Sequence, residues 1–442
     1  MQPTRRAAAA GRLRRFAIDV SPLRSSPAFR RLWGGSVVSV LGSQMTAVAV
    51  LIQIDAMTRS PFMVGLTGIF GFVPLLVFGV YGGSIVDAYD RRTLMLIANG
   101  GMALASAAVA VAVVGGLSSV WPLYALVAVQ SALTAIDSPA RGASLPALIG
   151  PERLPAANAL NQLSFNTGLV AGPLIAGLLV THSFAIVYFI DAVSFGAVLL
   201  AAARLPSLRP AGGGRRAGHS SVMEGLRWLK SQPLIAMTFY VDLVAMIFGM
   251  PRALFPVLAR ENFHVGPAAV GVMYAGIAFG ALLGAISGGW ISRVHRHGRA
   301  IVISIVVWGF ATATLGLTHI FWLGVTMLAI AGAADFVSAV FRSAMLQSGT
   351  PDEMRGRTGG VFIAVVAGGP RLGDLESGGV ARLVSPTFSV VSGGLATVVG
   401  VLVLAAAVPS FLRYDARTAP GRQDVPAQKS GDSRLGRVGE SD

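Results

Sequence analysis

The feature that most constrains the fold of this chain is a succession of apolar runs separated by short charged segments. A helix needs roughly 20 mostly apolar residues to cross about 30 Å of hydrocarbon, and these runs have that length. They are far longer than barrel strands and do not alternate between apolar and polar residues. A chain in lipid must satisfy its own backbone hydrogen bonds, so the runs are expected to be transmembrane helices. We place twelve spans, at residues 32–58, 62–86, 93–116, 121–142, 156–180, 184–205, 233–258, 267–291, 300–318, 320–342, 359–383 and 386–411.

The composition supports a membrane protein and argues against several other classes. Of the 442 residues, 54% are hydrophobic and 12% are charged, whereas a soluble domain has about 25% charged residues. The net charge of +15 does not indicate nucleic-acid binding, because the basic residues lie between apolar runs. The chain has no cysteine, no metal-ligand spacing among its six histidines and no Walker A sequence. We therefore expect no metal site, no cofactor and no enzyme activity.

The basic residues also indicate how the chain is oriented. If residues 1–31 lie in the cytoplasm, 30 of the 35 Lys and Arg residues fall on cytoplasmic segments and four on external ends. Cytoplasmic loops of membrane proteins carry such an excess of basic residues. We therefore expect a multi-pass protein of the cytoplasmic (inner) membrane with both termini in the cytoplasm, which requires an even number of spans.

The chain divides into two halves of six spans each. Between them, a segment with a proline, a run of three glycines and a short amphipathic piece is typical of a cytoplasmic linker. We expect a cytoplasmic N-terminal segment, a six-helix bundle, the linker, a second six-helix bundle and a disordered tail, at residues 1–31, 32–206, 207–232, 233–412 and 413–442. Arg141 and Glu152 recur as Arg342 and Glu353, both 201 residues later. This repeat favours a central cavity between two related halves that work by alternating access.

The segment between spans 2 and 3, residues 83–92, is a short charged turn between two long apolar runs. It contains a glycine, an acid and two adjacent arginines, at Gly83, Asp87, Arg91 and Arg92. A degenerate copy at residues 288–299 keeps the glycines and the basic charge but has no acid. The excess of cytoplasmic basic residues explains the arginines but not Asp87. Asp87 is therefore the residue of this turn that the charge bias leaves unexplained.

Span 5 carries small residues and a polar stripe. Small residues recur at three-to-four spacing, at Gly168, Gly172 and Gly177. They allow a neighbouring backbone to approach closely, and Pro173 removes a backbone donor and can bend the helix. The pattern fits either ordinary helix packing or a functional seal between helices. The polar stripe includes Asn161 and Asn166; lipid disfavours it, so it is expected to face the cavity or the other half.

Span 11 has three charged residues near its middle, and each is disfavoured there by roughly 2.5–3.5 kcal/mol. Arg371 and Asp374 are three residues apart, so they can pair on one face and fix helix packing. Glu376 points elsewhere in a regular helix, although the glycines around Pro370 favour a kink. The span therefore holds either a structural ion pair or an acid for substrate or proton binding. Glu376 is favoured for the second role because it lacks a local partner.

Some of the other acids inside the spans have arginines close by in the sequence. Asp137 lies four residues before Arg141, and Asp335 lies seven residues before Arg342. We expect each acid to pair with the arginine on its own helix. Asp191 in span 6 has no basic residue nearby.

Asp242 in span 7 also lacks a basic neighbour in the sequence. It is the favoured functional candidate among these acids, because Pro251 and Pro256 are expected to bend span 7 around it. In span 1, Gln44 and Asp55 lie on one face of the helix, three turns apart. Gln44 is deeper and is a cavity candidate, whereas Asp55 near the outer end is expected to be solvated.

Four stretches together carry a resemblance to a known family. They are the turn, the glycine-proline motif of span 5, the end of span 7 and the glycine-rich part of span 11, at residues 83–92, 168–177, 249–256 and 368–379. Over residues 28–412 the chain resembles the major facilitator superfamily of transporters. More narrowly, it resembles the enterobactin-exporter-like branch, the transmembrane secretion effectors. The resemblance implies an all-α membrane protein with twelve transmembrane helices in two pseudo-symmetric six-helix bundles.

The resemblance also implies a function. Such transporters export small amphipathic molecules of the siderophore or drug class by rocking of the two halves, with the proton as the default coupling ion. The implied partners are a small-molecule substrate, protons and the lipid bilayer, and the implied state is a monomer. The span 5 motif is implied to seal a helix contact. Asp87 is implied to dock near residues 358–360, where a helix dipole favours its charge, as part of a latch completed by Arg91, Arg92 and Arg141.

Two positions depart from the family pattern. Val127 stands three residues before Gln130, where many proton-coupled drug exporters have an arginine. Gln44 stands where relatives in the branch often have an acid. The coupling residue therefore remains open among three acids, Asp242, Asp374 and Glu376.

Two alternative functions remain. A metabolite importer on the same fold is the first, although sugar-porter patterns are not evident. A non-transporting membrane sensor is the second. A sensor needs a large soluble domain or a long signalling tail, and the short polar tail at residues 413–442 disfavours it.

Overall fold

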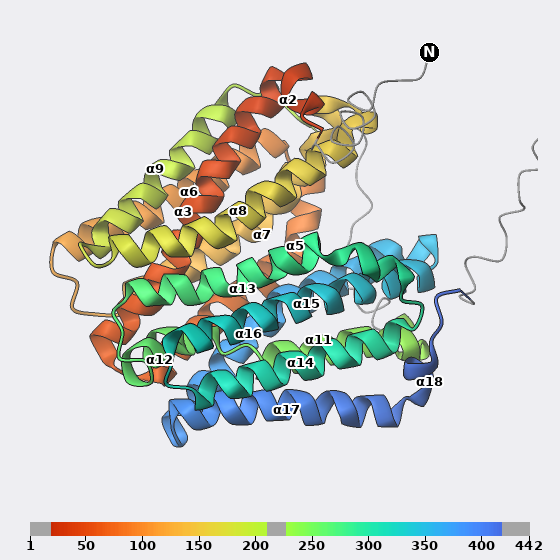
Figure 1. Cartoon of the computed structure of the whole chain (residues 1–442). Coiled ribbons are helices and arrows are strands. Elements are labelled where there is room, and N and C mark those ends of the chain that lie inside the picture. Colours follow the sequence, from red (N-terminus) through yellow and green to blue (C-terminus); the bar gives the residue numbers. More distant parts are fainter. Residues whose placement is uncertain (1–18, 210–226, 418–442) are drawn as a thin grey trace, which may run out of the picture.

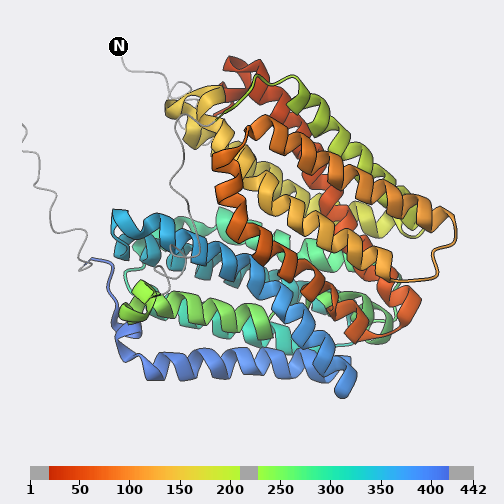
Figure 2. The same cartoon turned by 180° about the vertical axis from the view of Figure 1, so that it is seen from behind.

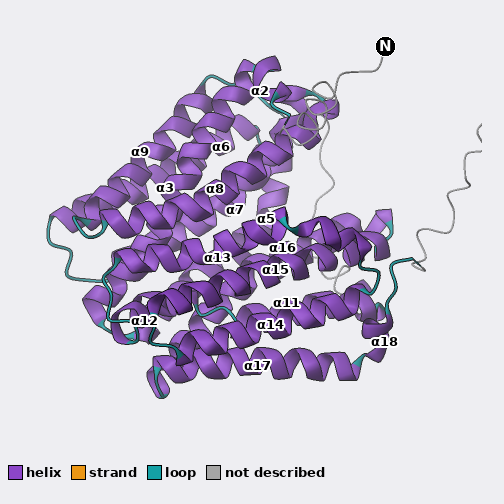
Figure 3. Cartoon of the chain, viewed as in Figure 1, coloured by secondary structure: helices purple, strands orange, loops and turns teal. Residues whose placement is uncertain are grey.

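The computed structural model describes residues 19–209 and 227–417, without the side chains of residues 80, 81, 83, 84, 352, 353 and 355–364. Within these ranges every regular element is a helix (Figure 3). Residues 1–18, 210–226 and 418–442 lie outside the described residues, and they make up much of the predicted N-terminal segment, linker and tail.

The helices before the linker correspond to the first six predicted spans. They are α2 (Ser21–Ser25), α3 (Pro27–Thr58), α4 (Pro61–Gly65), α5 (Thr67–Ala88), α6 (Arg91–Val114), α7 (Trp121–Ile149), α8 (Leu154–Leu179) and α9 (Phe184–Ala203). Those after it are α11 (Pro233–Phe248), the short 3-10 helix η2 (Arg252–Leu254), α12 (Phe255–Glu261), α13 (Ala268–Ile286), α14 (His297–Leu317), α15 (Phe321–Gly349), α16 (Asp352–Leu383), α17 (Pro386–Ala407) and α18 (Pro409–Arg413).

Ten helical stretches among the described residues are long and apolar enough to cross a membrane. The other two predicted spans fall on α7 and α16, which are 29 and 32 residues long. Both helices carry charged residues inside them, which lowers their mean hydropathy. Length and composition therefore support ten of the twelve predicted spans, and the remaining two are long helices packed among them.

Serine–proline pairs begin three of the long helical segments. Ser26, Ser60 and Ser385 each precede a proline, and each side chain accepts a hydrogen bond from a backbone N–H three residues later, at 3.1 to 3.5 Å. A serine at this position satisfies a donor that the helix leaves unpaired. Proline is favoured directly after it, because its fixed φ suits the first turn and its missing N–H is not needed there.

Span 7 differs from its prediction as one bent helix. The helix α11 ends at Phe248, residues 249–251 are non-helical, and the chain resumes as η2 and α12. The buried carbonyl of Gly249 accepts hydrogen bonds from Trp308 Nε1 at 2.8 Å and from Thr312 Oγ1 at 3.0 Å. Pro251 and Pro256 lack the N–H groups that a continuous helix would use. The interruption is tolerated because α14 supplies the donors.

The predicted turn at residues 83–92 is shorter than expected. The helix α5 continues to Ala88 and α6 begins at Arg91, so only Tyr89 and Asp90 lie between them. Gly83 therefore lies inside a helix, and its surroundings are outside the described side chains. Span 11 is also more regular than expected, since α16 passes through Pro370 as one continuous helix.

The long helices pack in two groups, one before the linker and one after it (Figures 1 and 2). The first group contains α3 and α5–α9, and the second contains α11 and α13–α17. The groups converge where α4 and α12 lie, which we call the α12 end, and they diverge toward α2 and α18, which we call the α2–α18 end. Between the groups, α8 packs against α13, and both α4 and α5 pack against α16.

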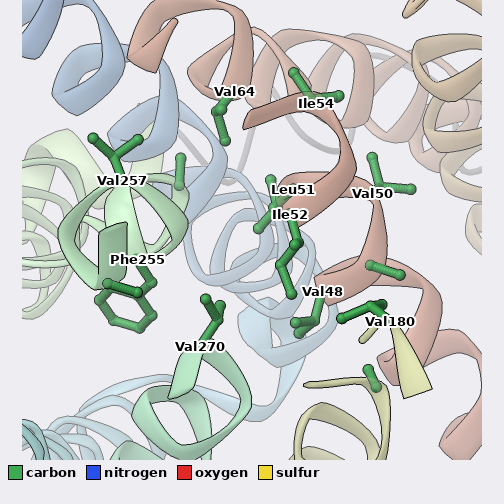
Figure 4. Packing of buried hydrophobic residues seen from close by; sticks show 14 of the residues in the cluster. Val48, Val50, Leu51, Ile52, Ile54, Val64, Val180, Phe255, Val257 and Val270 are labelled. Carbon is green, nitrogen blue, oxygen red and sulfur yellow. The ribbon is translucent and has the colours of Figure 1, made fainter. Parts of the chain in front are cut away.

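The largest cluster of buried apolar side chains lies at the α12 end and belongs to both groups. Val48 and Ile52 of α3 pack in the same cluster as Phe255 and Val257 of α12 (Figure 4). In lipid, tight packing rather than exclusion of water holds helices together. This cluster therefore joins the two groups at one end of the molecule.

Candidate functional site

An ion pair joins the two groups at the α12 end. Arg260 of α12 donates from Nη2 to Oδ1 of Asp55 at 2.9 Å and from Nε to Oδ2 at 3.1 Å. Asp55, near the end of α3, is only 5% exposed. The prediction that Asp55 is solvated is therefore wrong. Its partner is 205 residues away in the chain, so no local pattern indicates the pair.

The small residues of span 5 allow close contacts in two directions. A side chain on Gly168 or Gly172 would run into Val40 and Gln44 of α3. Farther along α8, Gly177 lies against the backbone of Ala268, and the Pro173 carbonyl lies against Gly271 of α13. The motif therefore packs α8 against its own group at one end and against the other group near the α12 end. The sealing role implied for it stays a prediction.

The polar candidates of spans 1 and 5 are not brought together with one another by any hydrogen bond. Gln44 is half-buried, and its Cβ lies opposite Gly172. Asn161 is half-buried, whereas Asn166 is exposed and accepts a hydrogen bond from Gln162 at 3.0 Å. These residues are thus accessible along α3 and α8, and their place in a substrate pathway stays a prediction.

The charged residues of α16 face different neighbours. Arg371 Nη2 donates to Ser131 Oγ of α7 at 3.3 Å, which is a contact between the two groups. Asp374 Oδ1 accepts from the Ala253 N–H of η2 at 3.1 Å. No ion pair joins Arg371 to Asp374 among the described contacts, so the predicted local pair does not form. Glu376 is half-buried and has no hydrogen bond or ion pair with any residue described.

A buried ion pair lies in each group. In the first group, Arg141 bonds both to Asp137, four residues earlier on α7, and to Ser36 of α3. Asn99 Nδ2 also donates to Asp137, at 2.6 Å. The predicted pairing of Asp137 with Arg141 is therefore confirmed.

In the second group the predicted pair also forms, because Nη2 of Arg342 on α15 donates to Oδ1 of Asp335 at 3.5 Å. The same arginine also forms an ion pair with Asp242 of α11, which was not predicted. Asp242 and Arg342 are 3% and 6% exposed. Asp242 is therefore not isolated, although its cation lies far away in the sequence. This pair ties α11 to α15 just before the break in span 7.

The arginines of the predicted latch bond within the first group. Arg91 Nη1 donates to the Ala143 carbonyl and Arg92 Nη2 to the Ala203 carbonyl, both at 2.7 Å. Asp87 is half-buried, and its implied docking site near residues 358–360 lies outside the described side chains. The latch therefore stays a prediction.

Asp90 is a residue of this turn that sequence reasoning overlooked. Its Oδ1 accepts from the N–H groups of Arg92, at 2.9 Å, and Leu208, at 3.0 Å, and its Oδ2 accepts from Ser207 Oγ at 2.6 Å. Partial burial opposes the charged form, but these hydrogen bonds outweigh it and lower the pKa of Asp90. An aspartate just before a helix start is the signal that could have found it.

Comparison with known proteins decides the family. A family described as transmembrane secretion effectors matches residues 17–430. The chain belongs to this family. The enterobactin exporter EntS of Escherichia coli K12 is 31% identical to this transmembrane secretion effector over 411 residues, which is 92% of the chain and 97% of EntS. EntS of Citrobacter koseri is 31% identical over 395 residues, which is 88% and 94% of the two chains.

Solved structures of other transporters share the fold of this secretion effector. A POT family transporter in complex with 5-aminolevulinic acid matches with a TM-score of 0.70 and 10% identity, covering 87% of this chain and 97% of that one. A bacterial homologue of the lysosomal transporter Spinster matches with a TM-score of 0.66 and 14% identity, covering 91% and 98%. The predicted major facilitator fold and the enterobactin-exporter-like branch are thus confirmed, and the family consists of transporters rather than enzymes.

Proposed function

We propose that this secretion effector exports a small amphipathic molecule of the siderophore or drug class across the cytoplasmic membrane, driven by protons. The family supports export, and the relationship to EntS, an enterobactin exporter, extends over nearly the whole length of both chains. The polar residues of α3 and α8 and the charged residues of α16 would offer polar contacts to such a substrate.

The observation that carries the proposal is the asymmetry between the two ends of the molecule. The groups are joined at the α12 end by the shared apolar cluster and by Asp55–Arg260. Toward the α2–α18 end, the two groups diverge (Figures 1 and 2). Export by alternating access needs a state closed on one side and open on the other.

The excess of basic residues supports a cytoplasmic position for the α2–α18 end. With this orientation the structure corresponds to the state in which an exporter takes up its substrate. The two groups, proposed to span residues 32–206 and 233–412, would rock about their contacts within a monomer. In the opposite state Asp87, Arg91, Arg92 and Arg141 would form the latch.

Transport in everted membrane vesicles tests this function, with enterobactin as a siderophore probe and a cationic dye as a drug probe. We expect accumulation of one of them when the vesicle interior is acidified, and its loss when a protonophore is added. Vesicles without the protein are the control. Accumulation that is insensitive to the protonophore would contradict proton coupling, and movement in the opposite direction would favour a metabolite importer.

The role of span 11 can be tested in the same vesicles. Glu376→Gln and Asp374→Asn each remove one acid while keeping its shape. We expect Glu376→Gln to lower accumulation, because Glu376 lacks a partner and is accessible for a substrate or proton. If both variants transport as well as the wild type, the acids of α16 have a structural role only.

Opening of the α12 end can be tested by labelling, because the chain has no cysteine of its own. A single cysteine is placed at Val270, which is buried in the shared cluster. Asp55→Asn removes the charge that pairs with Arg260, so we expect faster labelling of that cysteine. Glu261→Gln is the matched control, since Glu261 also contacts Arg260 but is 41% exposed. Equal labelling rates in both variants would show that the ion pair does not hold this end closed.

A further inference from the structure

One buried carboxylate of the first group forms no ion pair with any residue that the structure describes. Asp191 lies in the middle of α9 and is 0% exposed, between α9 and the neighbouring helices α3 and α6. Its Oδ2 accepts hydrogen bonds from Ser106 Oγ at 2.7 Å and from Gln130 Nε2 at 2.9 Å. Gln130 Nε2 also donates to Ser106 Oγ at 3.0 Å. Residues of α6 and α7 thus converge on one oxygen of this acid.

The second oxygen of the same carboxylate is buried beside a threonine. Asp191 Oδ1 and Thr46 Oγ1 of α3 are both buried, and neither has another hydrogen-bond partner among the described residues, but Thr46 lies close enough to interact with Asp191. Gly42, one turn earlier on α3, makes room for this oxygen, because a Cβ there would come within 3.0 Å of Oδ1. A threonine hydroxyl can both donate and accept a hydrogen bond. Thr46 can therefore donate to the ionised Oδ1 or accept from the protonated Oδ1, so the site offers a partner to either state.

The surroundings of Asp191 contain no charge that compensates its own. None of the described side chains of α3, α6, α7 and α8 that face it is charged. Tyr188, one turn earlier on α9, is the titratable neighbour, and its hydroxyl donates to Gln53 at 2.7 Å. An isolated charge buried between membrane helices is costly, and binding a proton removes it. Asp55, Asp137 and Asp242 avoid this cost through arginines.

We propose that Asp191 is a proton-binding site of this transporter and that Gln130 senses its state. Hydrogen bonds to a charged acceptor are about twice as strong as those to a neutral one. Loss of the proton from Oδ1 therefore tightens the bonds from Ser106 and Gln130 to Oδ2, and its return loosens them.

The helix that carries Gln130 connects this site to the other group. Ser131, the next residue on α7, accepts the hydrogen bond from Arg371 of α16. A shift of α7 at Gln130 therefore acts directly on a contact between the groups. A role in transport for this link between Asp191 and the Ser131–Arg371 contact rests on the proposed proton-driven export. Proton binding at Asp191 does not depend on that proposal.

Infrared difference spectroscopy of the full-length protein in lipid vesicles tests the site without a substrate. The spectra compare mildly acidic with alkaline pH and report the carbonyl stretch of protonated carboxyl groups. We expect the wild type to lose such a band on alkalinisation and Asp191→Asn to lack the part of it that Asp191 contributes. Asp137→Asn is the matched control, because Asp137 is a buried acid of the same group that is paired with Arg141, and it should keep the band.

A second variant keeps the test decisive if Asp191→Asn does not fold. Ser106→Ala removes one donor from the carboxylate, so the midpoint of the band should move to higher pH. The proposal is overturned if the band persists unchanged in Asp191→Asn, or if its midpoint stays fixed in Ser106→Ala. A titrating Asp191 band together with transport that ignores a protonophore would contradict proton-driven export and leave the site standing.

Discussion

Each group of helices holds an arginine that is paired with an acid in its interior, but the two groups arrange the charges around that arginine differently. In the second group, Arg342 pairs with Asp242 on another helix and lies near Asp335 as well. In the first group, Arg141 pairs with Asp137 on its own helix, and Asp191 is left without a cation. Arg342 is thus shared by two acids, whereas Arg141 pairs with one acid and does not reach Asp191.

The comparison is meaningful because the two arginines occupy corresponding places. The helices α7 and α15 are both 29 residues long and begin 200 residues apart, at Trp121 and Phe321. Arg141 and Arg342 lie at nearly the same depth in them. The arginine of α15 thus links two helices, whereas the arginine of α7 pairs within its own helix.

The largest effect is expected from Arg342→Gln. The variant leaves Asp242 buried without its cation, and breaking a buried pair in this way costs about 3–5 kcal/mol. Thermal unfolding of the purified protein in detergent, followed by tryptophan fluorescence, measures the loss. The double variant Arg342→Leu with Asp242→Leu removes both charges and should recover much of the stability. An unchanged unfolding temperature in Arg342→Gln would mean that the cross-link between α11 and α15 does not form.

A smaller loss is expected from Arg141→Gln. Asp137 keeps the hydrogen bond from Asn99 at 2.6 Å, so the buried acid is not left without a donor. The loss should be about 1–3 kcal/mol, measured in the same unfolding experiment. If Arg141→Gln destabilises the protein as much as Arg342→Gln does, the two arginines contribute equally to stability, which contradicts the proposed difference between the groups.

The difference between contacts within one helix and contacts between helices also explains which features could be predicted from the sequence. The length of the apolar runs predicted where the helices lie, because few structures other than helices satisfy the backbone hydrogen bonds in lipid. Spacing of three or four residues identified the small face of α8 and the pair Asp137–Arg141, since neighbours on a helix surface are set by its period. These predictions depend only on the geometry of a single helix.

The contacts that sequence reasoning missed join helices that lie far apart in the chain. Asp55 and Asp242 pair with arginines 205 and 100 residues away, and neither pairing leaves a local pattern. The absence of a basic neighbour in the sequence was therefore a poor guide to isolation: Asp242 has a cation, and Asp191 does not. The unwound part of span 7 was also missed, because the donors that stabilise it belong to α14.

The smallest effect concerns the helix starts that follow spans 2 and 8, where the groups differ again. Asp90 caps α6, whereas α14 in the second group begins at Arg296 without a side-chain cap. Asp90→Ala should lower the free energy of unfolding by about 1 kcal/mol. Asp87→Ala is the matched control in the same turn, because Asp87 does not cap the helix.

The pH dependence of this cap has a definite sign. The pKa of Asp90 is lowered in the folded protein, so its contribution is fully present above the unfolded pKa of about 3.9 and is lost as the pH falls through the folded value. The difference in stability between the wild type and Asp90→Ala should therefore be constant near neutral pH and shrink in acid. A difference that grows as the pH falls would show that the charge of Asp90 does not stabilise the start of α6, and the two groups would then begin these helices in the same way.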